Sequence, residues 1–262
     1  MRTPHRLQGL LRVAASLVLA ELVCIPVHAQ WTKVPAANVP RGPDGKPNLV
    51  APSPRLPDGK PDLSGIWEAE GNFNQNLAKD LKEVPYQPWA KTLADERSTG
   101  SREAEDPTAN CLPQGVPRIN AVPPPWRIIQ TPKYMAILYE AFHSWRQIFL
   151  DGRELGDDFD PAWLGYSTGK WDGDTLVVDS RGFNGKTWLD QPGKPTTDAL
   201  HVVERFRRKD FGHLEIQITI DDPKAYTKPW TVTEQAHLLT DTDLLEFICN
   251  ENNIDVGHLK GK

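Results

Sequence analysis

The sequence lacks both a long apolar segment and the strongest catalytic signatures. Its N-terminal apolar run, 13–23, is shorter than the about 20 apolar residues that a transmembrane helix needs and is interrupted by Glu21. No HExxH or CxxC sequence, no phosphate-binding loop and no dinucleotide-binding GxGxxG motif is present. Three kinds of function remain: cofactor-free acid/base catalysis, chemistry at a metal ion, and binding without catalysis.

Positive charge is also scarce, with 30 basic against 35 acidic residues and a formal net charge of −5. The densest basic cluster, within 205–209, lies beside Glu204 and Asp210 and is typical of a solvated strand face. Contact with nucleic-acid phosphates needs a basic stripe. We therefore expect no nucleic-acid partner.

The first 29 residues are typical of a secretory signal peptide. Arg2, Arg6 and Arg12 form a basic region, an apolar region follows, and Val27-His28-Ala29 supplies the small-residue cleavage pattern. We expect a periplasmic or secreted protein with no stable membrane insertion after cleavage. Removal of this segment would change the formal charge from −5 to −7, because three arginines and one glutamate leave with it.

Export also bears on cofactors. Nucleotide cofactors are cytosolic, so none is expected. His213 and Glu215 lie two apart on one expected strand face and could supply two metal ligands, but zinc needs at least a third protein ligand and none is evident. We expect neither a cofactor nor a bound metal.

Only three cysteines are present, and Cys24 would leave with the signal peptide. The remaining pair, Cys111 and Cys249, predicts one disulfide in an oxidising compartment. Chain-entropy arguments value a bond that closes so long a loop at about 5 kcal/mol, as an upper figure. The alternative is a pair of buried free thiols.

Residues 30–63 predict an extended proline-rich arm, not a domain. The segment Pro43-Asp44-Gly45-Lys46-Pro47 recurs as Pro57-Asp58-Gly59-Lys60-Pro61, and each copy predicts a turn followed by a proline that blocks a helix. Residues 64–262 are expected to form a single domain around one core. Helical spacing over 86–104, with a proline in the first turn, predicts its one substantial helix.

Short strands dominate the remainder of the chain. The clearest runs from His213 to Asp221, where Leu214, Ile216 and Ile218 alternate with polar residues. The Asp-Gly pair at 172–173 predicts a hairpin, and 240–243 predicts another turn. The strands are expected at 64–68, 126–131, 134–142, 145–150, 163–171, 174–181, 199–208, 213–221, 230–239 and 243–250.

Many short antiparallel strands must avoid exposed edges, and closure into a barrel removes them. We therefore expect an all-β fold, mainly antiparallel, arranged as a lipocalin-like β-barrel. The interior of an eight-stranded barrel is just wide enough for one small ligand. The fold hypothesis thus favours small-molecule binding.

His143 and Arg146 interrupt an apolar stretch and are candidate catalytic residues. If their segment forms a hairpin, both side chains can reach the barrel mouth. Arg146 could then hold a carboxylate or oxyanion, and His143 could move a proton near neutral pH. The alternative is a tight turn with polar side chains in water.

Glu204 is the third catalytic candidate. Strand alternation places it on the same face as Val202 and Phe206, where a carboxylate is costly unless it is paired. Either it pairs with an arginine such as Arg146, or it has a raised pKa suited to general acid or base catalysis. The two hypotheses are compatible, because a buried Glu-Arg-His cluster is also typical of a proton-transfer site.

Three further residues are candidate ligand contacts. Trp188 and Asp190 follow a glycine-containing loop, and loops at one end of a barrel are common ligand sites. A structural cap on the barrel is the alternative for both. Tyr139, on an expected strand, is a third candidate for the pocket.

Several segments resemble a large, mostly uncharacterised family of secreted β-rich bacterial proteins. The resemblance implies export and a β-rich fold but no particular activity. It is carried by 57–67 (PDGKPDLSGIW), 106–113 (DPTANCLP), 146–149 (RQIF), 163–167 (WLGYS), 171–178 (WDGDTLVV) and 204–206 (ERF). A histidine is common in that family where this chain has Pro195-Thr196-Thr197, and its absence here argues against a catalytic role for that segment.

Gly65-Ile66-Trp67 is also similar to the start of lipocalin strands. Lipocalins usually pack an arginine from a late strand over that tryptophan, and here no arginine follows Arg208. The likeness therefore describes shape and not descent.

Three functions follow from these observations. The first is a secreted barrel that binds one small apolar or aromatic molecule. The second is a cofactor-free periplasmic lyase, isomerase or hydrolase that uses His143 or Glu204 for proton transfer and Arg146 as an electrostatic clamp. The third is a protein-interaction module whose proline-rich arm docks a partner.

Overall fold

The computed structural model of the chain describes residues 38–156, 158 and 160–251. The expected signal peptide, 1–29, lies outside the described residues, as does the start of the arm. The described part belongs to one compact unit, Pro35–Lys262. None of its helices is both long enough and apolar enough to cross a membrane.

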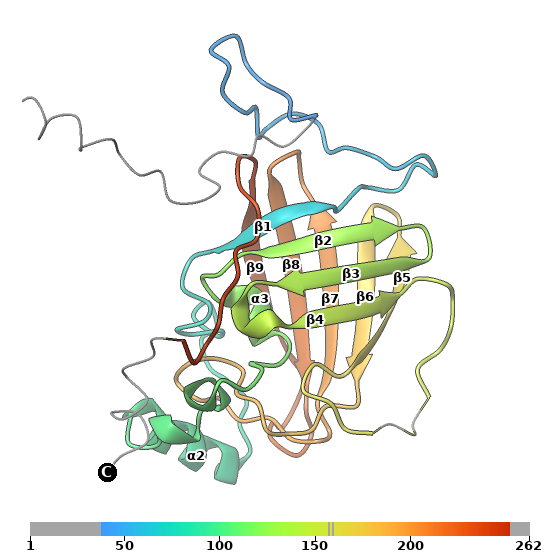
Figure 1. Cartoon of the computed structure of the whole chain (residues 1–262). Helices are drawn as coiled ribbons and strands as arrows, with labels where there is room; N and C mark the ends of the chain where they lie inside the picture. The colour runs from blue at the N-terminus through green and yellow to red at the C-terminus, as the bar shows by residue number, and fades with distance from the viewer. Residues whose placement is uncertain (1–37, 157, 159, 252–262) are drawn as a thin grey trace, which may run out of the picture. The chain divides into compact units, whose positions relative to one another are not determined.

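Nine strands close into a barrel, which confirms the expected all-β fold (Figure 1). All neighbouring strands are antiparallel except β4 and β5, which are parallel and share only two register positions. The strands are β1 (Gly65–Glu70), β2 (Trp126–Thr131), β3 (Tyr134–Tyr139), β4 (Trp145–Phe149), β5 (Tyr166–Asp172), β6 (Thr175–Arg181), β7 (His201–Arg208), β8 (His213–Asp221) and β9 (Trp230–Leu239).

The core lies inside the barrel and follows from strand alternation. In β8 every second residue, from Leu214 to Ile220, is buried, and β7 and β9 show the same period. Large side chains such as Trp67, Trp126 and Phe206 fill the interior and are fully buried. The barrel is therefore a packed core, in contrast to the open, ligand-sized interior that the sequence suggested.

Most expected strands are confirmed to within a few residues, and the hairpin at 172–173 joins β5 to β6. The strand expected at 243–250 is wrong. β9 already pairs with β8 on one side and with β1 on the other, so the closed sheet has no edge left for another strand. Residues 240–251 instead run without regular structure, and Asp243 forms an ion pair of 2.5 Å with Arg127.

Helix α2 (Pro88–Ser98) is shorter than the expected 86–104. At its end the hydroxyls of Thr99 and Ser101 both donate to the carbonyl of Glu96, and the N–H of Gly100 donates to the carbonyl of Arg97. The chain then continues as two short 3₁₀ turns, η1 (Glu103–Glu105) and η2 (Pro107–Asn110), and a four-residue helix, α3 (Arg118–Ala121).

One end of the barrel is covered by these helices and loops, and we call it the capped end (Figure 1). The loop between β6 and β7, residues 182–200, also lies at this end. It contacts the segment after β1 there, because the N–H of Gln191 donates to the carbonyl of Asn74 at 2.7 Å. α2 is fastened to the loop between β8 and β9 by the indole N–H of Trp89, which donates to the carbonyl of Lys224 at 2.8 Å.

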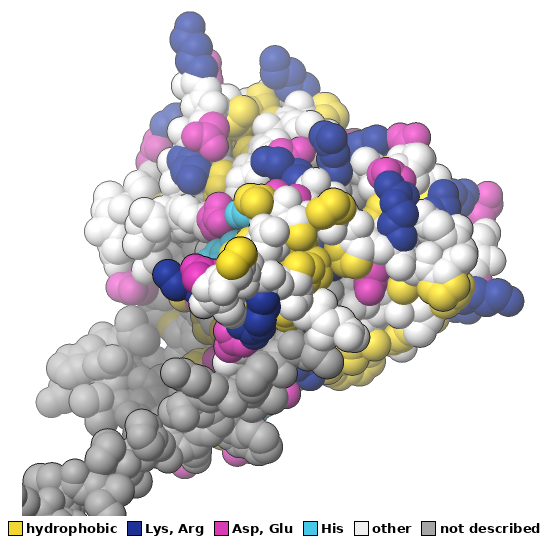
Figure 2. All heavy atoms as spheres, turned by 90° about the horizontal axis from the view of Figure 1, so that it is seen from above, with side chains coloured by type: hydrophobic (Ala, Val, Ile, Leu, Met, Phe, Trp, Pro, Cys, Tyr) yellow, Lys and Arg dark blue, Asp and Glu magenta, His cyan; other side chains and the backbone are white. Residues whose placement is uncertain are grey.

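The described part of the arm, 38–63, forms two small turns that repeat every 14 residues. Each closes an isolated bridge, Arg41 with Pro47 and Arg55 with Pro61. The two arginines then pair with barrel carboxylates, Asp241 and Asp174 respectively. In the space-filling view from above, basic and acidic side chains are interspersed and form no basic stripe on that face (Figure 2).

Arg208 connects the barrel to the end of the arm. Its guanidinium lies 4.9 Å from the ring of Trp67 and donates to the carbonyl of Asp62 at 2.6 Å and to the carbonyl of Phe211. Burial lowers its pKa to about 10. The arginine that packs over the tryptophan of β1 is therefore Arg208 itself, at the end of β7. The sequence analysis had looked for such an arginine only after Arg208.

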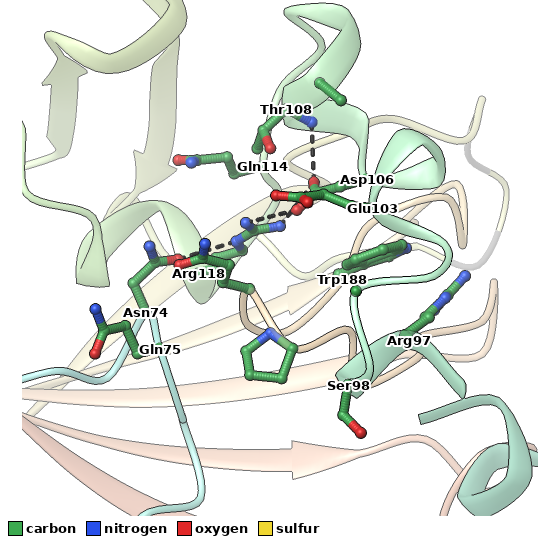
Figure 3. Close-up of a pocket in the computed structure, with 14 residues that line it drawn as sticks. Asn74, Gln75, Arg97, Ser98, Glu103, Asp106, Thr108, Gln114, Arg118 and Trp188 are labelled. Atoms are coloured by element: carbon green, nitrogen blue, oxygen red, sulfur yellow. Dashed lines mark hydrogen bonds and ion pairs between the residues drawn. The ribbon is translucent and has the colours of Figure 1, made fainter. Parts of the chain in front are cut away.

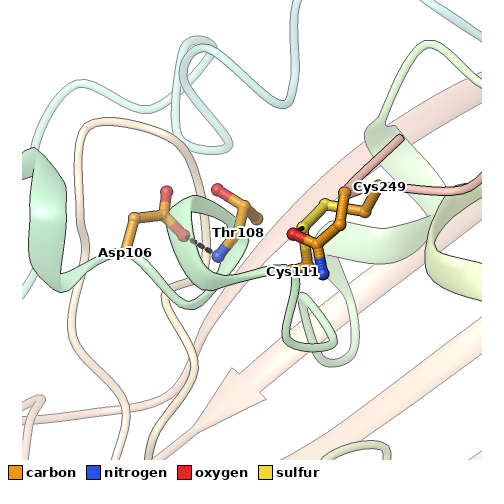
Figure 4. The surroundings of a disulfide bond; sticks show 5 residues. Asp106, Thr108, Cys111 and Cys249 are labelled. Atoms are coloured by element: carbon orange, nitrogen blue, oxygen red, sulfur yellow. Dashed lines mark hydrogen bonds between the residues drawn. A yellow bond between two sulfur atoms is a disulfide. The ribbon is translucent and has the colours of Figure 1, made fainter. Parts of the chain in front are cut away.

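The predicted disulfide between Cys111 and Cys249 is confirmed, with the two Cα atoms 5.6 Å apart (Figure 4). Cys111 directly follows η2 and takes a left-handed backbone conformation, with φ of 55°. The bond therefore fastens the C-terminal segment 240–251 to the η2 turn at the capped end.

Candidate functional site

Arg146 and Glu204 form a buried ion pair inside the barrel. The Nη2 of Arg146 lies 2.5 Å from Oε2 of Glu204, and the side chains are 1% and 0% exposed. Arg146 also donates to the hydroxyls of Ser167 and Ser180, at 3.1 and 2.7 Å. Burial acts to lower the pKa of Arg146, but the charge of Glu204, together with the interaction with Tyr139 and the hydrogen bonds to both, leaves the pKa raised. The pairing expected for Glu204 is confirmed.

The second oxygen of Glu204 is bound by α3. The side-chain amide of Asn120 donates to Oε1 of Glu204 at 2.9 Å and accepts from the hydroxyl of Tyr139 at 2.8 Å. Burial raises the pKa of Tyr139, so its hydroxyl stays a donor. Both carboxylate oxygens of Glu204 are thus occupied, and Tyr139 is committed to the same internal network.

His143 lies apart from this network. It is exposed, in the short η3 turn (Ala141–His143), and its Nε2 accepts from the backbone N–H of Phe247 at 3.3 Å. No contact joins it to Arg146 or Glu204 among the described residues. The structure therefore brings two of the three catalytic candidates together, in the closed barrel, and leaves the third outside.

Gly165 to Gly169 spell G-x-S-x-G, a pattern that the sequence-based predictions missed and wrongly took to be absent. In hydrolases this pattern forms a sharp turn between a strand and a helix that exposes the serine. Here Ser167 is in strand β5, 1% exposed, and bonded to Arg146 and Ser180. The serine supports the ion pair and is not presented as a nucleophile.

Asp190 has a structural position. It is fully buried and accepts from the backbone N–H groups of Leu77 and Lys194 and from the ammonium of Lys194 at 2.6 Å. These bonds fix the loop between β6 and β7 against the segment after β1. Trp188, two residues earlier, lies at a cavity.

That cavity, of about 560 Å³, lies at the capped end (Figure 3). None of its lining residues belongs to a strand, so it is built by loops and helix ends outside the barrel. They are Asn74, Gln75, Arg97, Ser98, Gly100, Glu103, Asp106, Thr108, Ala109, Gln114, Arg118, Trp188, Gln191 and Pro192. We call it the capped-end cavity.

Asp106 and Arg118 form one wall of the capped-end cavity. Two parallel hydrogen bonds of 2.9 and 2.8 Å join the guanidinium to the carboxylate, and both side chains are buried. Asp106 also caps η2 by accepting from the N–H of Thr108, and Arg118 Nε donates to Asn74 at 3.1 Å. The charges of Asp106 and Arg118 therefore neutralise each other, and the hydrogen bonds to Thr108 and Asn74 fix the position of this wall.

Arg97 forms the opposite side, at the end of α2. Its guanidinium lies 4.3 Å from the ring of Trp188 and donates to the carbonyl of Gly193 at 3.2 Å. Burial lowers its pKa, and among the described residues no carboxylate forms an ion pair with it. Its Nε, though buried, has no hydrogen-bond partner in the described part of the chain.

Gln114 adds a second unsatisfied group. Its side chain is 7% exposed, and its Oε1 has no partner among the described residues. The cavity therefore offers a cation with an open donor and an amide with an open acceptor, beside an indole. Buried polar atoms are rarely left without partners, so a ligand or ordered water that binds both would be stabilised there.

Of these residues the sequence analysis identified only Trp188. Arg97 lies within the expected 86–104 helix, and no role was predicted for Gln114 or Arg118. The matching stretch 106–113 lies at this cavity, but its residues were not assigned to a site. Nothing in their spacing shows that three separate segments meet.

No protein-family model matches the chain, and no curated protein matches its sequence.

Proposed function

We propose that the protein binds a small aromatic carboxylate in the capped-end cavity. The observation that carries the proposal is Arg97, a partly buried guanidinium stacked on Trp188 with no acidic partner among the described residues. A buried charge is costly unless it is paired, so an anionic ligand would supply the missing partner. Arginine donors also match the geometry of a carboxylate.

The other walls define the remainder of the ligand. The indole of Trp188 offers a flat apolar surface, and Oε1 of Gln114 would accept a hydrogen bond from a hydroxyl or amide of the ligand. A volume of about 560 Å³ is within the range of small-molecule sites. The ligand is therefore aromatic in part, as the sequence suggested, but acidic as well.

The carboxylates near Arg97 are paired or solvated. The charge of Glu105 acts to raise the pKa of Arg97, but Glu105 is itself paired with Arg102 at 2.7 Å. Asp106 is neutralised by two hydrogen bonds from Arg118, and the exposed side chain of Glu103 is solvated. We place this binding outside the cytoplasm, on the support of the N-terminal signal sequence and the disulfide.

The test is a titration of the purified protein with benzoate, cinnamate and indole-3-acetate by calorimetry. Each has a neutral or cationic counterpart of similar shape, such as benzyl alcohol and benzylamine for benzoate. At least one acid should bind, and its counterparts should bind at least tenfold more weakly. Equal binding of acid and alcohol, or binding of none of the acids, would refute the proposal.

Two variants locate the site. Arg97→Gln should weaken binding of the acid at least tenfold with an unchanged melting temperature. Arg102→Gln is the matched control, because Arg102 is a nearby surface arginine that already pairs with Glu96 and Glu105 and does not line the cavity. It should change the affinity less than twofold.

A further inference from the structure

A groove opens in the barrel wall where β4 and β5 diverge. The two parallel strands pair only at Ile148 with Ser167 and at Phe149 with Thr168. Towards the start of β4 they separate, and a groove of about 460 Å³ lies between them. It is lined by Pro113, Phe142, His143, Ser144, Trp145, Arg146, Gln147, Phe149, Ala162, Trp163, Leu164, Gly165, Tyr166 and Ser167, and we call it the seam groove.

Aromatic side chains line this groove on both sides. Trp145 and Phe149 come from β4, whereas Trp163 and Tyr166 come from the segment that enters β5. Trp145 is 60% exposed, which is unusual for the largest apolar side chain. Facing aromatic walls favour a planar ring between them, because offset and edge-to-face contacts are favourable.

The polar content of the groove is small and carries no negative charge. No aspartate or glutamate is among its lining residues. Arg146 donates to Glu204, Ser167 and Ser180, and Ser167 also bonds Ser180, but the buried Nη1 of Arg146 has no hydrogen-bond partner among the described residues. The groove therefore combines aromatic rings with a few hydrogen-bonding groups and no carboxylate, which favours an aromatic molecule that carries one polar group over a sugar.

The wall formed by 163–166 is held in place by Gly165. This residue has φ of +62°, and a Cβ there would lie 2.7 Å from the carbonyl oxygen of Arg181 and 2.8 Å from Phe183. Only glycine allows the chain to approach β6 so closely. The groove is therefore fixed by the backbone before any ligand arrives, which lowers the entropy cost of binding.

The floor near η3 is fixed by the C-terminal segment. The ring of Phe247 meets that of Phe142 edge-on at 5.8 Å, and its N–H donates to His143 Nε2. Because Nε2 accepts, a neutral His143 ring carries its proton on Nδ1 and keeps one donor.

We propose that the seam groove is a second binding site, for a neutral planar aromatic molecule. It is independent of the capped-end cavity, because the two share no lining residue and differ in charge. The ligand class follows from the aromatic residues on both sides of the groove and from the absence of carboxylates from its lining.

The test uses 2-naphthol as the probe, with titration followed by calorimetry. Trp145→Ala should weaken binding at least tenfold, and Trp145→Phe should recover most of the affinity. Trp89→Ala is the matched control, since Trp89 is a similarly exposed tryptophan on α2 that does not line the groove. Thermal unfolding of each variant confirms that it is folded.

Three results would overturn the proposal. One is that the wild type does not bind 2-naphthol, or that it binds 2-naphthol no more tightly than Trp145→Ala does. Another is equally tight binding of cyclohexylmethanol, which would show a generally apolar surface and no preference for planar rings. The third is self-association that disappears in Trp145→Ala, which would make the groove an interface between copies of the chain. Arg97→Gln should leave 2-naphthol binding unchanged, so failure at one site is distinguishable from failure at the other.

Discussion

Replacing Arg146 by methionine tests whether the ion pair inside the barrel stabilises the fold. The substitution keeps an unbranched side chain of comparable reach but removes the charge. Glu204, which is 0% exposed, then retains only the hydrogen bond from Asn120. Ser167 and Ser180 remain bonded to each other at 3.0 Å, so they add little to the loss.

The expected magnitude follows from the uncompensated charge. Breaking a buried ion pair by removing one partner costs about 3–5 kcal/mol of the free energy of unfolding. The double variant Arg146→Met, Glu204→Leu removes both charges and leaves only the amide of Asn120 without an acceptor, a cost of about 1–3 kcal/mol. The double variant should therefore be more stable than Arg146→Met alone.

Urea denaturation at pH 7, followed by tryptophan fluorescence, measures these differences. Arg127→Met is the control, because its ion pair with Asp243 is one-third or more exposed and should be worth no more than about 1 kcal/mol. The reasoning fails if Arg146→Met costs less than 1 kcal/mol, or if the double variant is less stable than the single one.

Two further predictions concern a carboxyl group and a pair of glycines. Burial, and then the charge of Glu204, raises the pKa of Glu234 well above its usual value, so the folded state binds a proton that the unfolded state releases above about pH 4.5. The wild type should lose up to about 1.4 kcal/mol per pH unit from there up to the raised pKa, relative to Glu234→Gln, and parallel unfolding curves from pH 5 to 8 would contradict this. Gly173→Ala should cost about 1–2 kcal/mol, for left-handed backbone alone. Gly185→Ala should cost about 1–3 kcal/mol more, because its Cβ would lie 2.7 Å from the backbone N of Asp198; equal melting temperatures would refute the steric argument.

The sequence was most informative where one local rule determines the structure. Alternation predicted β8, and the Asp-Gly pair at 172–173 predicted the hairpin between β5 and β6, because each feature depends on neighbouring residues only. Alternation also placed Glu204 on the inner face and so required a partner for it. Arg146 was the correct partner.

The site was less predictable because it depends on tertiary packing. Arg97, Gln114 and Trp188 are far apart in the chain and come together only when α2 and two loops pack at the capped end. The strand expected at 243–250 failed for a related reason. Its composition suits a strand, but the barrel closes through β1 and β9 and leaves no edge to receive it.

The disulfide encloses almost the whole barrel. Cys111 precedes β2, and Cys249 follows β9, so the loop that the bond closes contains eight of the nine strands. A chain that ends before Cys249 cannot form the bond, however many strands it has paired. Oxidation of this cysteine pair therefore requires synthesis of every strand of the barrel, and it fixes η2, at the wall of the capped-end cavity, only after the last strand has been made.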